Sequence, residues 1–275
     1  MDFTASIVVG YDDTTASAGA VRWAAELARD TRRPLRLVHA WTLPMLGHGM
    51  AGVPVMDPAG PRNQALRVLD DAVDAVSDVT REIAVTTELL PGNPRDVLGE
   101  VSVTADLLVV GTRGLGAVMS TLLGSVSRGI LHDAGCPVAI IRSDQHRAGP
   151  VLAAVDGSEA GQEAVDAASD LAAAWGTALR IVHVRAGGAA ADADGLLEAA
   201  VQRARGRHDG ITVDAGLLEG RSVPDALLTA AAGARILVMG HRGVSRGPFG
   251  STAHATLLHA TGNVMVARQC DGAGT

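Results

Sequence analysis

The chain contains no lysine, and all 23 of its basic residues are arginine. The absence of lysine excludes the phosphate-binding lysine of a P-loop, Schiff-base catalysis and any lysine general base. Aromatic residues are also scarce, with two Phe, one Tyr and three Trp, although hydrophobic residues make up 47% of the sequence. The core must therefore be built from Ala, Val, Leu and Ile, which is typical of parallel sheets that are buried on both faces.

Cysteine, basic charge and long apolar runs are lacking as well. Cys136 and Cys270 are too few for a disulfide framework and are not spaced as metal ligands. The net charge of -7 argues against a nucleic-acid or anionic-membrane surface, which would need a basic stripe. No run approaches ~20 apolar residues, and the first residues leave no room for a signal peptide. We therefore expect a cytoplasmic globular protein with no nucleic-acid or membrane surface, and we assign no residue as a metal ligand.

What the chain does have is an internal repeat. Residues 7–40 align without a gap on residues 151–184, a shift of 144, which pairs Asp12 with Asp156 and His39 with His183. A unit of roughly 140 residues is an ordinary size for one domain. The repeat predicts one domain over residues 1–142 and a second over residues 150–270, joined by a short polar linker.

Each half alternates short apolar runs with segments of helical spacing. The runs predict strands at 7–10, 35–40, 85–90, 107–110 and 138–141, and at 151–155, 179–184, 212–217, 236–239 and 264–267. Helices are predicted over 16–29 and 65–79, and a further one begins at Asn93 and Pro94. The fold class is therefore α/β, with two tandem Rossmann-like, doubly wound domains of five parallel strands and four helices each.

Two regions of this pattern raise further expectations. The apolar last strands, 138–141 and 264–267, would be exposed sheet edges unless they are paired, either in a homodimer or between the two halves of one chain. Residues 41–60 hold three Pro and four Gly and predict a long loop. That loop is either a flap over a site or a segment packed against the sheet.

A glycine motif that suits phosphate binding follows the fourth predicted strand of the first half. Gly111 and Gly114 enclose Thr112 and Arg113, and after nine intervening residues Gly124 and Ser125 open a helix. Glycines at these points allow a backbone turn with positive φ and a close approach to a ligand. The helix start offers unpaired N–H groups and the positive end of its dipole, which suit a phosphate chain. The hydroxyls of Ser125 and Ser127 would add donors, and Arg113 either reaches phosphate or is solvated.

Acidic and histidine residues at the strand ends have two interpretations each. Asp12 and Asp156 either cap the following helix or bind a ribose hydroxyl or a metal that bridges phosphates. An acidic residue in this turn excludes a dinucleotide fingerprint, where pyrophosphate would have to approach. For His39 and His183 we favour packing or a backbone hydrogen bond over catalysis.

These motifs resemble the tandem form of the universal stress protein family, and the similarity covers nearly the whole chain. Gly111, Gly114, Gly124 and Ser125 match the family's ATP-binding pattern, and the turn at Asp156 matches its motif after the first strand. The resemblance implies an adenine nucleotide, ATP with or without Mg²⁺, and pairing of subunits through the fifth strands. The residues that it implies for the first site are Asp12, the backbone of Val38, His39 and Ala40, and the loop and helix start at Gly111, Arg113, Gly114, Gly124, Ser125, Val126 and Ser127.

The second half departs from this pattern. Only six residues separate Gly243 from Gly250, and Pro248 among them removes one backbone donor. We therefore expect the first site to bind ATP more tightly than the second. Whether the second half binds nucleotide stays open at this point, and the residues expected for its site are Asp156, Val182, Gly240, Gly243, Gly250, Ser251 and Thr252.

Three functions remain open at this point. The leading hypothesis is an ATP-binding regulatory module of the stress response, because a complete phosphate loop stands without an evident catalytic base. The alternatives are a slow ATPase or adenylyl-transferring enzyme, and a partner-binding scaffold that needs no nucleotide. We assign no catalytic residue.

Overall fold

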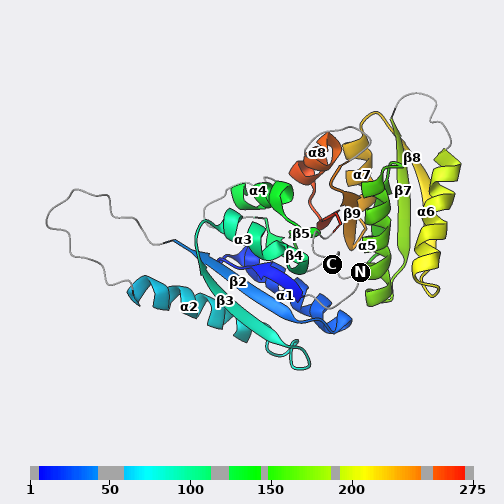
Figure 1. Ribbon diagram of the computed structural model, residues 1–275. Helices are drawn as coiled ribbons and strands as arrows, with labels where there is room; N and C mark the ends of the chain where they lie inside the picture. Colours follow the sequence, from blue (N-terminus) through cyan, green and yellow to red (C-terminus); the bar gives the residue numbers. More distant parts are fainter. Residues whose placement is uncertain are drawn as a thin grey trace, which may run out of the picture.

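A computed structural model describes residues 6–42, 59–112, 124–143, 148–186, 193–242 and 250–269. Within them, strands and helices alternate in two copies (Figure 1). The first half comprises β1 (Ser6–Gly10), α1 (Thr15–Thr31), β2 (Leu35–Trp41), α2 (Ala59–Asp74), β3 (Val85–Pro91), α3 (Pro94–Ser102), β4 (Ala105–Gly111), α4 (Ser125–Asp133) and β5 (Val138–Ile141). The second comprises β6 (Val151–Val155), α5 (Glu159–Trp175), β7 (Leu179–Ala186), α6 (Ala193–Arg207), β8 (Val213–Gly220), α7 (Val223–Ala231), β9 (Ile236–Gly240), α8 (Ser251–His259) and β10 (Val264–Ala267).

The predicted elements are present, and their ends differ from the prediction in places. Helix α2 begins at Ala59 rather than at residue 65 and ends at Asp74 rather than at residue 79, so both predicted ends were wrong. Pro61 falls in its first turn, where the missing N–H would have no partner inside the helix. Trp41 closes β2, so the predicted loop over residues 41–60 was too long at both ends. Residues 43–58, on which the flap interpretation depends, lie outside the described residues.

All described strands form one sheet, in the order β3-β2-β1-β4-β5-β10-β9-β6-β7-β8. In each half the first strand lies between the second and the fourth strands of that half. All strand pairs within a half are parallel. The two halves meet where β5 and β10 pair antiparallel, with Val138 opposite Val266 and Ile140 opposite Val264 (Figure 1). The predicted α/β fold is confirmed, and the last strands pair within the chain, which was one of the two expected arrangements.

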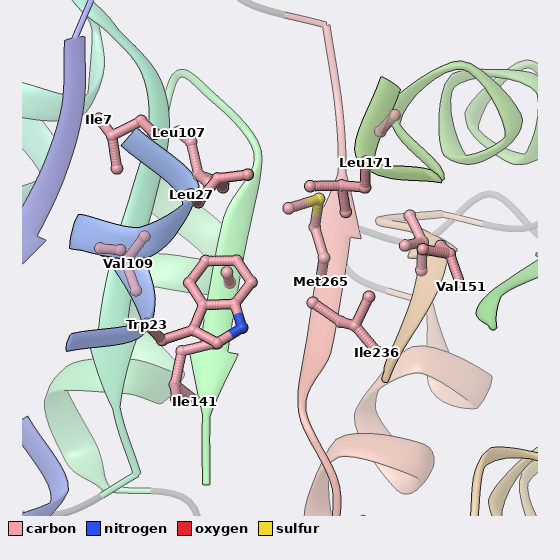
Figure 2. Packing of buried hydrophobic residues seen from close by; sticks show 14 of the residues in the cluster. Ile7, Trp23, Leu27, Leu107, Val109, Ile141, Val151, Leu171, Ile236 and Met265 are labelled. Atoms are coloured by element: carbon pink, nitrogen blue, oxygen red, sulfur yellow. The ribbon is translucent and has the colours of Figure 1, made fainter. Parts of the chain in front are cut away.

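Both faces of the sheet are covered by helices, and each face has a core that runs through the junction. Helices α1, α2, α5 and α6 pack on one face and α3, α4, α7 and α8 on the other. Figure 2 shows Trp23 and Ile141 of the first half near Met265 of β10. The indole rings of Trp23 and Trp175 meet edge to face with their centroids 5.9 Å apart, so α1 and α5 are joined across the junction. No described helix is long and apolar enough to cross a membrane.

A charge placed in the β5–β10 pair tests this arrangement. Val266 has no exposed surface, so Val266→Asp buries an unpaired carboxylate between the halves. We expect the free energy of unfolding to fall by about 3 kcal/mol or more in a urea titration. Val103→Asp is the matched control, because Val103 is 49% exposed and its substitution should leave the midpoint unchanged. Equal midpoints for the two variants would contradict the observed pairing.

Candidate functional site at the carboxyl ends of the strands

The predicted site residues gather at one edge of each half-sheet. In the second half, the ends of β6, β7 and β9 and the start of α8 surround a cavity of about 260 Å³. Six predicted residues line it, namely Asp156, Val182, Gly240, Gly250, Ser251 and Thr252, while Gly243 lies outside the described residues. Strand β6 lies between β7 and β9, so the connections after β6 and β9 diverge to opposite faces. Such a crevice is the usual ligand site of an open α/β sheet.

The corresponding elements of the first half have the same arrangement. Asp12 follows β1, residues 38–40 end β2, and Gly111 ends β4. Because β1 pairs in parallel with both β2 and β4, these ends lie at one edge of the sheet. Gly124 precedes α4 and completes the set, whereas Arg113 and Gly114 lie outside the described residues.

Helices α4 and α8 begin without the side-chain caps that several other helices have. Thr14, Asn93, Ser158 and Ser222 cap α1, α3, α5 and α7 through side-chain oxygens. At α4 and α8 the cap positions are Gly124 and Gly250, and no side chain caps the first-turn N–H groups of either helix. The first-turn N–H groups of these two helices are therefore available to an anion.

The two loops between strand and helix close in the same way although their lengths differ. The N–H of Gly124 donates to the carbonyl of Thr112 over 3.0 Å, and the N–H of Gly250 donates to the carbonyl of His241 over 3.0 Å. The shorter second loop thus leaves the start of its helix in the equivalent position. Residues 113–123 and 243–249, which include Pro248, lie outside the described residues.

The first glycine of each motif has a packing role that the sequence analysis did not predict. A Cβ at Gly111 would lie 2.6 Å from the backbone carbon of Ala16, and one at Gly240 would lie 2.6 Å from the backbone oxygen of Ala160. Neither glycine, nor Gly124, has a positive φ, so the predicted positive-φ turn was wrong at these positions. Each first glycine instead allows β4 or β9 to approach the first turn of α1 or α5.

The aspartates at the strand ends are held by the turn that follows them. Asp12 Oδ1 accepts the hydroxyl of Thr14 over 2.6 Å, and Asp156 Oδ1 accepts the hydroxyl of Ser158 over 2.5 Å. The backbone N–H groups of Thr14 and Ser158 donate to the same oxygens. Each carboxylate is therefore fixed in orientation beside the cap of the next helix, and Asp156 also lines the cavity.

Both strand-end histidines make the predicted hydrogen bond to the backbone. His39 Nδ1 lies 2.7 Å from the carbonyl oxygen of Tyr11, and His183 Nδ1 lies 2.9 Å from that of Val155. A carbonyl only accepts, so Nδ1 carries the proton in both rings. Each histidine thereby fixes the residue that precedes the site aspartate.

Ser127 does not have the role that the sequence suggested. Its side chain is buried, and its hydroxyl donates to the carbonyl of Gly111 over 3.0 Å. A hydroxyl has one hydrogen to donate, so in this arrangement Ser127 offers none to phosphate. Ala253 occupies the equivalent place in α8. Ser125 and Ser251, by contrast, are exposed at the helix starts.

Comparison with known proteins identifies the family. The family model described as "Universal stress protein family" matches residues 4–142 and 148–268. A universal stress protein of Mycobacterium tuberculosis (strain ATCC 25618 / H37Rv) is 30% identical over 290 residues, which cover 96% of this chain and 97% of that protein. The chain belongs to the universal stress protein family.

Other members of the family are similar over different extents. A universal stress protein of Mycolicibacterium smegmatis is 34% identical over 194 residues, which cover 65% of this chain and 63% of that protein. The crystal structure of a universal stress protein from Archaeoglobus fulgidus DSM 4304 superposes with a TM-score of 0.76 at 21% identity, covering 97% of this chain and 100% of that one. The structural match shows that the two chains share a fold.

An apolar wall of the cavity was missed by the sequence analysis. Val223 and Leu227 of α7 and Met239 of β9 line it together with the polar residues. The available signal was the cap at Ser222, which places Leu227 five residues into the helix, as Asn93 places Leu98 in α3. One wall of the cavity is therefore apolar, and most of it comes from a helix that carries no motif.

Several ionisable groups near the two sites have shifted pKa values. Burial, and to a smaller extent the nearby Asp13 carboxylate, raises the pKa of Tyr11 to about 12, so this phenol stays neutral and donates to Asp13. Burial and the charge of Arg268 lower the pKa of His241. His241 is therefore neutral at pH 7, and a cation that lines the second cavity is Arg242.

The packing role of the first glycine can be tested at Gly111. Gly111→Ala forces a Cβ into the backbone of α1 and should lower the free energy of unfolding by about 1–3 kcal/mol. Gly19 lies in the same helix α1, and a Cβ added there would have nothing within 4 Å, so Gly19→Ala should stabilise the protein by about 0.5–1 kcal/mol. Chemical denaturation measures both, and a neutral Gly111→Ala would contradict this role.

Proposed function

We propose that the protein is an adenine-nucleotide-binding regulatory module, with one binding site in each half and ATP as the ligand of the first. The observation that carries this proposal is the cavity of the second half. It combines an uncapped helix start, a fixed carboxylate, an arginine and an apolar wall within one pocket. Each of these features fits one part of a nucleotide.

The parts of a nucleotide can be assigned to the second cavity in order. Phosphate oxygens suit the first-turn N–H groups of Ser251 and Thr252, together with the guanidinium of Arg242. A ribose hydroxyl suits the carboxylate of Asp156, which accepts hydrogen bonds. The base would lie against the backbone of residues 182–184 and the apolar side chain of Leu227.

The first half offers the same polar groups in a longer loop. Gly124 and Ser125 begin α4, and Arg113 and Gly114 complete the family's ATP-binding pattern in the sequence. Where Mg²⁺ accompanies ATP, the carboxylate of Asp12 would help to hold it, since Mg²⁺ prefers oxygen ligands and substrate phosphates. The residues therefore suit a triphosphate in the first site.

Regulation rather than rapid turnover is supported by the groups around the second cavity. His183 donates Nδ1–H to a backbone carbonyl, and Oδ1 of Asp156 accepts from Ser158, so the described contacts give both side chains a role in holding the site. Phosphoryl transfer needs a positioned nucleophile as well as charge neutralisation.

Cys136 is a buried thiol outside any disulfide, which suits the reducing cytoplasm that we propose as the setting. A homodimer of the chain stays a prediction, and it would need a surface other than the last strands, since these pair with each other within the chain.

The first experiment identifies what the purified protein carries. Denaturation followed by chromatography of the released small molecules should yield ATP, and a titration of nucleotide-free protein should restore binding. Release of ADP with continuous production of phosphate would favour the slow ATPase. Neither carried nor restored nucleotide would overturn the proposal and favour a partner-binding scaffold.

A second experiment assigns the two sites. A carboxylate at the helix start repels phosphate, so Gly124→Glu should abolish the tighter binding event in calorimetry and Gly250→Glu the weaker one. Gly206→Glu is the matched control, because Gly206 is exposed on α6 with nothing within 4 Å of a Cβ. The first site should bind about a hundredfold more tightly, equivalent to two charge-assisted hydrogen bonds lost in the shorter loop. Loss of the tighter event through Gly250 would contradict this order.

A further inference from the structure

Two arginines at the junction each bind a helix of the opposite half. Arg142 follows β5, and its Nη2 donates to the carbonyl of Leu257 in α8 over 2.5 Å. Arg268 follows β10, and its Nη2 donates to the carbonyl of Leu131 in α4 over 2.5 Å, while Nη1 donates to the carbonyl of Ala134. The two contacts are equivalent in the repeat and reciprocal between the halves.

The antiparallel strand pair causes this exchange of partners. Strand β10 starts shortly after α8 ends, and β5 starts shortly after α4 ends. Because β5 and β10 run in opposite directions, the end of each strand lies beside the start of the other. The residue after each strand therefore meets the last turn of the other half's helix, which parallel pairing would not allow.

The arginines suit the position both in charge and in shape. The last carbonyls of a helix have no partner within it and carry the negative end of its dipole, which a guanidinium satisfies. Burial lowers the pKa of Arg142 to about 10, so its side chain still carries a charge at neutral pH. Removing a buried charge from its partners is costly, so these contacts hold the helix ends firmly.

The same two helices begin at the proposed phosphate sites. Each has nine residues, which corresponds to a rod of roughly 13 Å. Its start is tied to its own half, by the N–H of Gly124 to Thr112 or by that of Gly250 to His241. Its far end is tied to the other half by arginine. The position of the first-turn N–H groups therefore depends on both halves.

We propose that Arg268 is a positioning residue for the phosphate site at the start of α4, and Arg142 one for the site at the start of α8. In each site, the helix that offers its N-terminal N–H groups is held at its C-terminal end by an arginine of the other half. This inference rests on the proposed function for its ligand. The contact exists only because both halves are present, since each half alone would lack the arginine that holds its helix.

The test compares the two arginine variants in the full chain. ATP affinity is measured by calorimetry for Arg268→Gln and Arg142→Gln, with Gly250→Glu or Gly124→Glu added to isolate one site. Arg268→Gln should weaken the first site about tenfold more than the second, and Arg142→Gln the second about tenfold more than the first, comparable to one hydrogen bond misplaced at phosphate. Equal effects of each variant on both sites would overturn the proposal, because general destabilisation has no crossed pattern.

A second readout needs no nucleotide. Hydrogen exchange of the backbone amides of residues 128–131, the first that donate within α4, should accelerate about tenfold in Arg268→Gln, and that of residues 254–257 of α8 in Arg142→Gln. If either glutamine variant fails to fold, Arg268→Lys and Arg142→Lys replace it, since lysine keeps the charge but loses the forked donor. Crossed exchange without any ATP binding would overturn the proposed function and leave the positioning role standing. ATP binding without crossed exchange would overturn the positioning role alone.

Discussion

The antiparallel pairing of β5 with β10 is the constraint on which the rest of the molecule depends. Two four-residue strands, each fully buried, convert two half-sheets into one. An apolar strand edge exposed to water invites association, and here each edge protects the other. The pairing also sets α1 against α5 through Trp23 and Trp175, so that a single core passes under both halves.

The relative positions of the site residues are set mainly by close packing between strand and helix backbones. Gly111 and Gly240 bring a strand against the first turn of a helix, and that turn holds the cap beside Asp12 or Asp156. Ser127 then ties α4 back to the carbonyl of Gly111. In both halves, the motif therefore keeps the carboxylate, the first glycine and the helix start in fixed relative positions.

Particular residues show how far sequence reasoning could reach. The alternation of apolar runs located the strands because buried parallel strands leave a continuous apolar signature. The hydrogen bonds of His39 and His183 were expected, since a repeated strand-end histidine more often binds the backbone than a substrate. The role of Ser127 was misjudged because sequence spacing puts its hydroxyl near a helix start but does not tell which acceptor it meets. The apolar wall at Leu227 was missed because α7 carries no motif that links it to the glycine loop.

By itself the sequence determined the repeat, the α/β class, the alternation of elements and the residues at the strand ends. These follow from local patterns, because periodicity and glycine or proline placement act within a few residues. Only the tertiary structure decided that the last strands pair within one chain, that the first glycine serves packing, and that Arg142 and Arg268 reach helices of the opposite half. Those outcomes depend on which distant backbone and carbonyl groups come within contact distance, and strand direction at the junction fixes that.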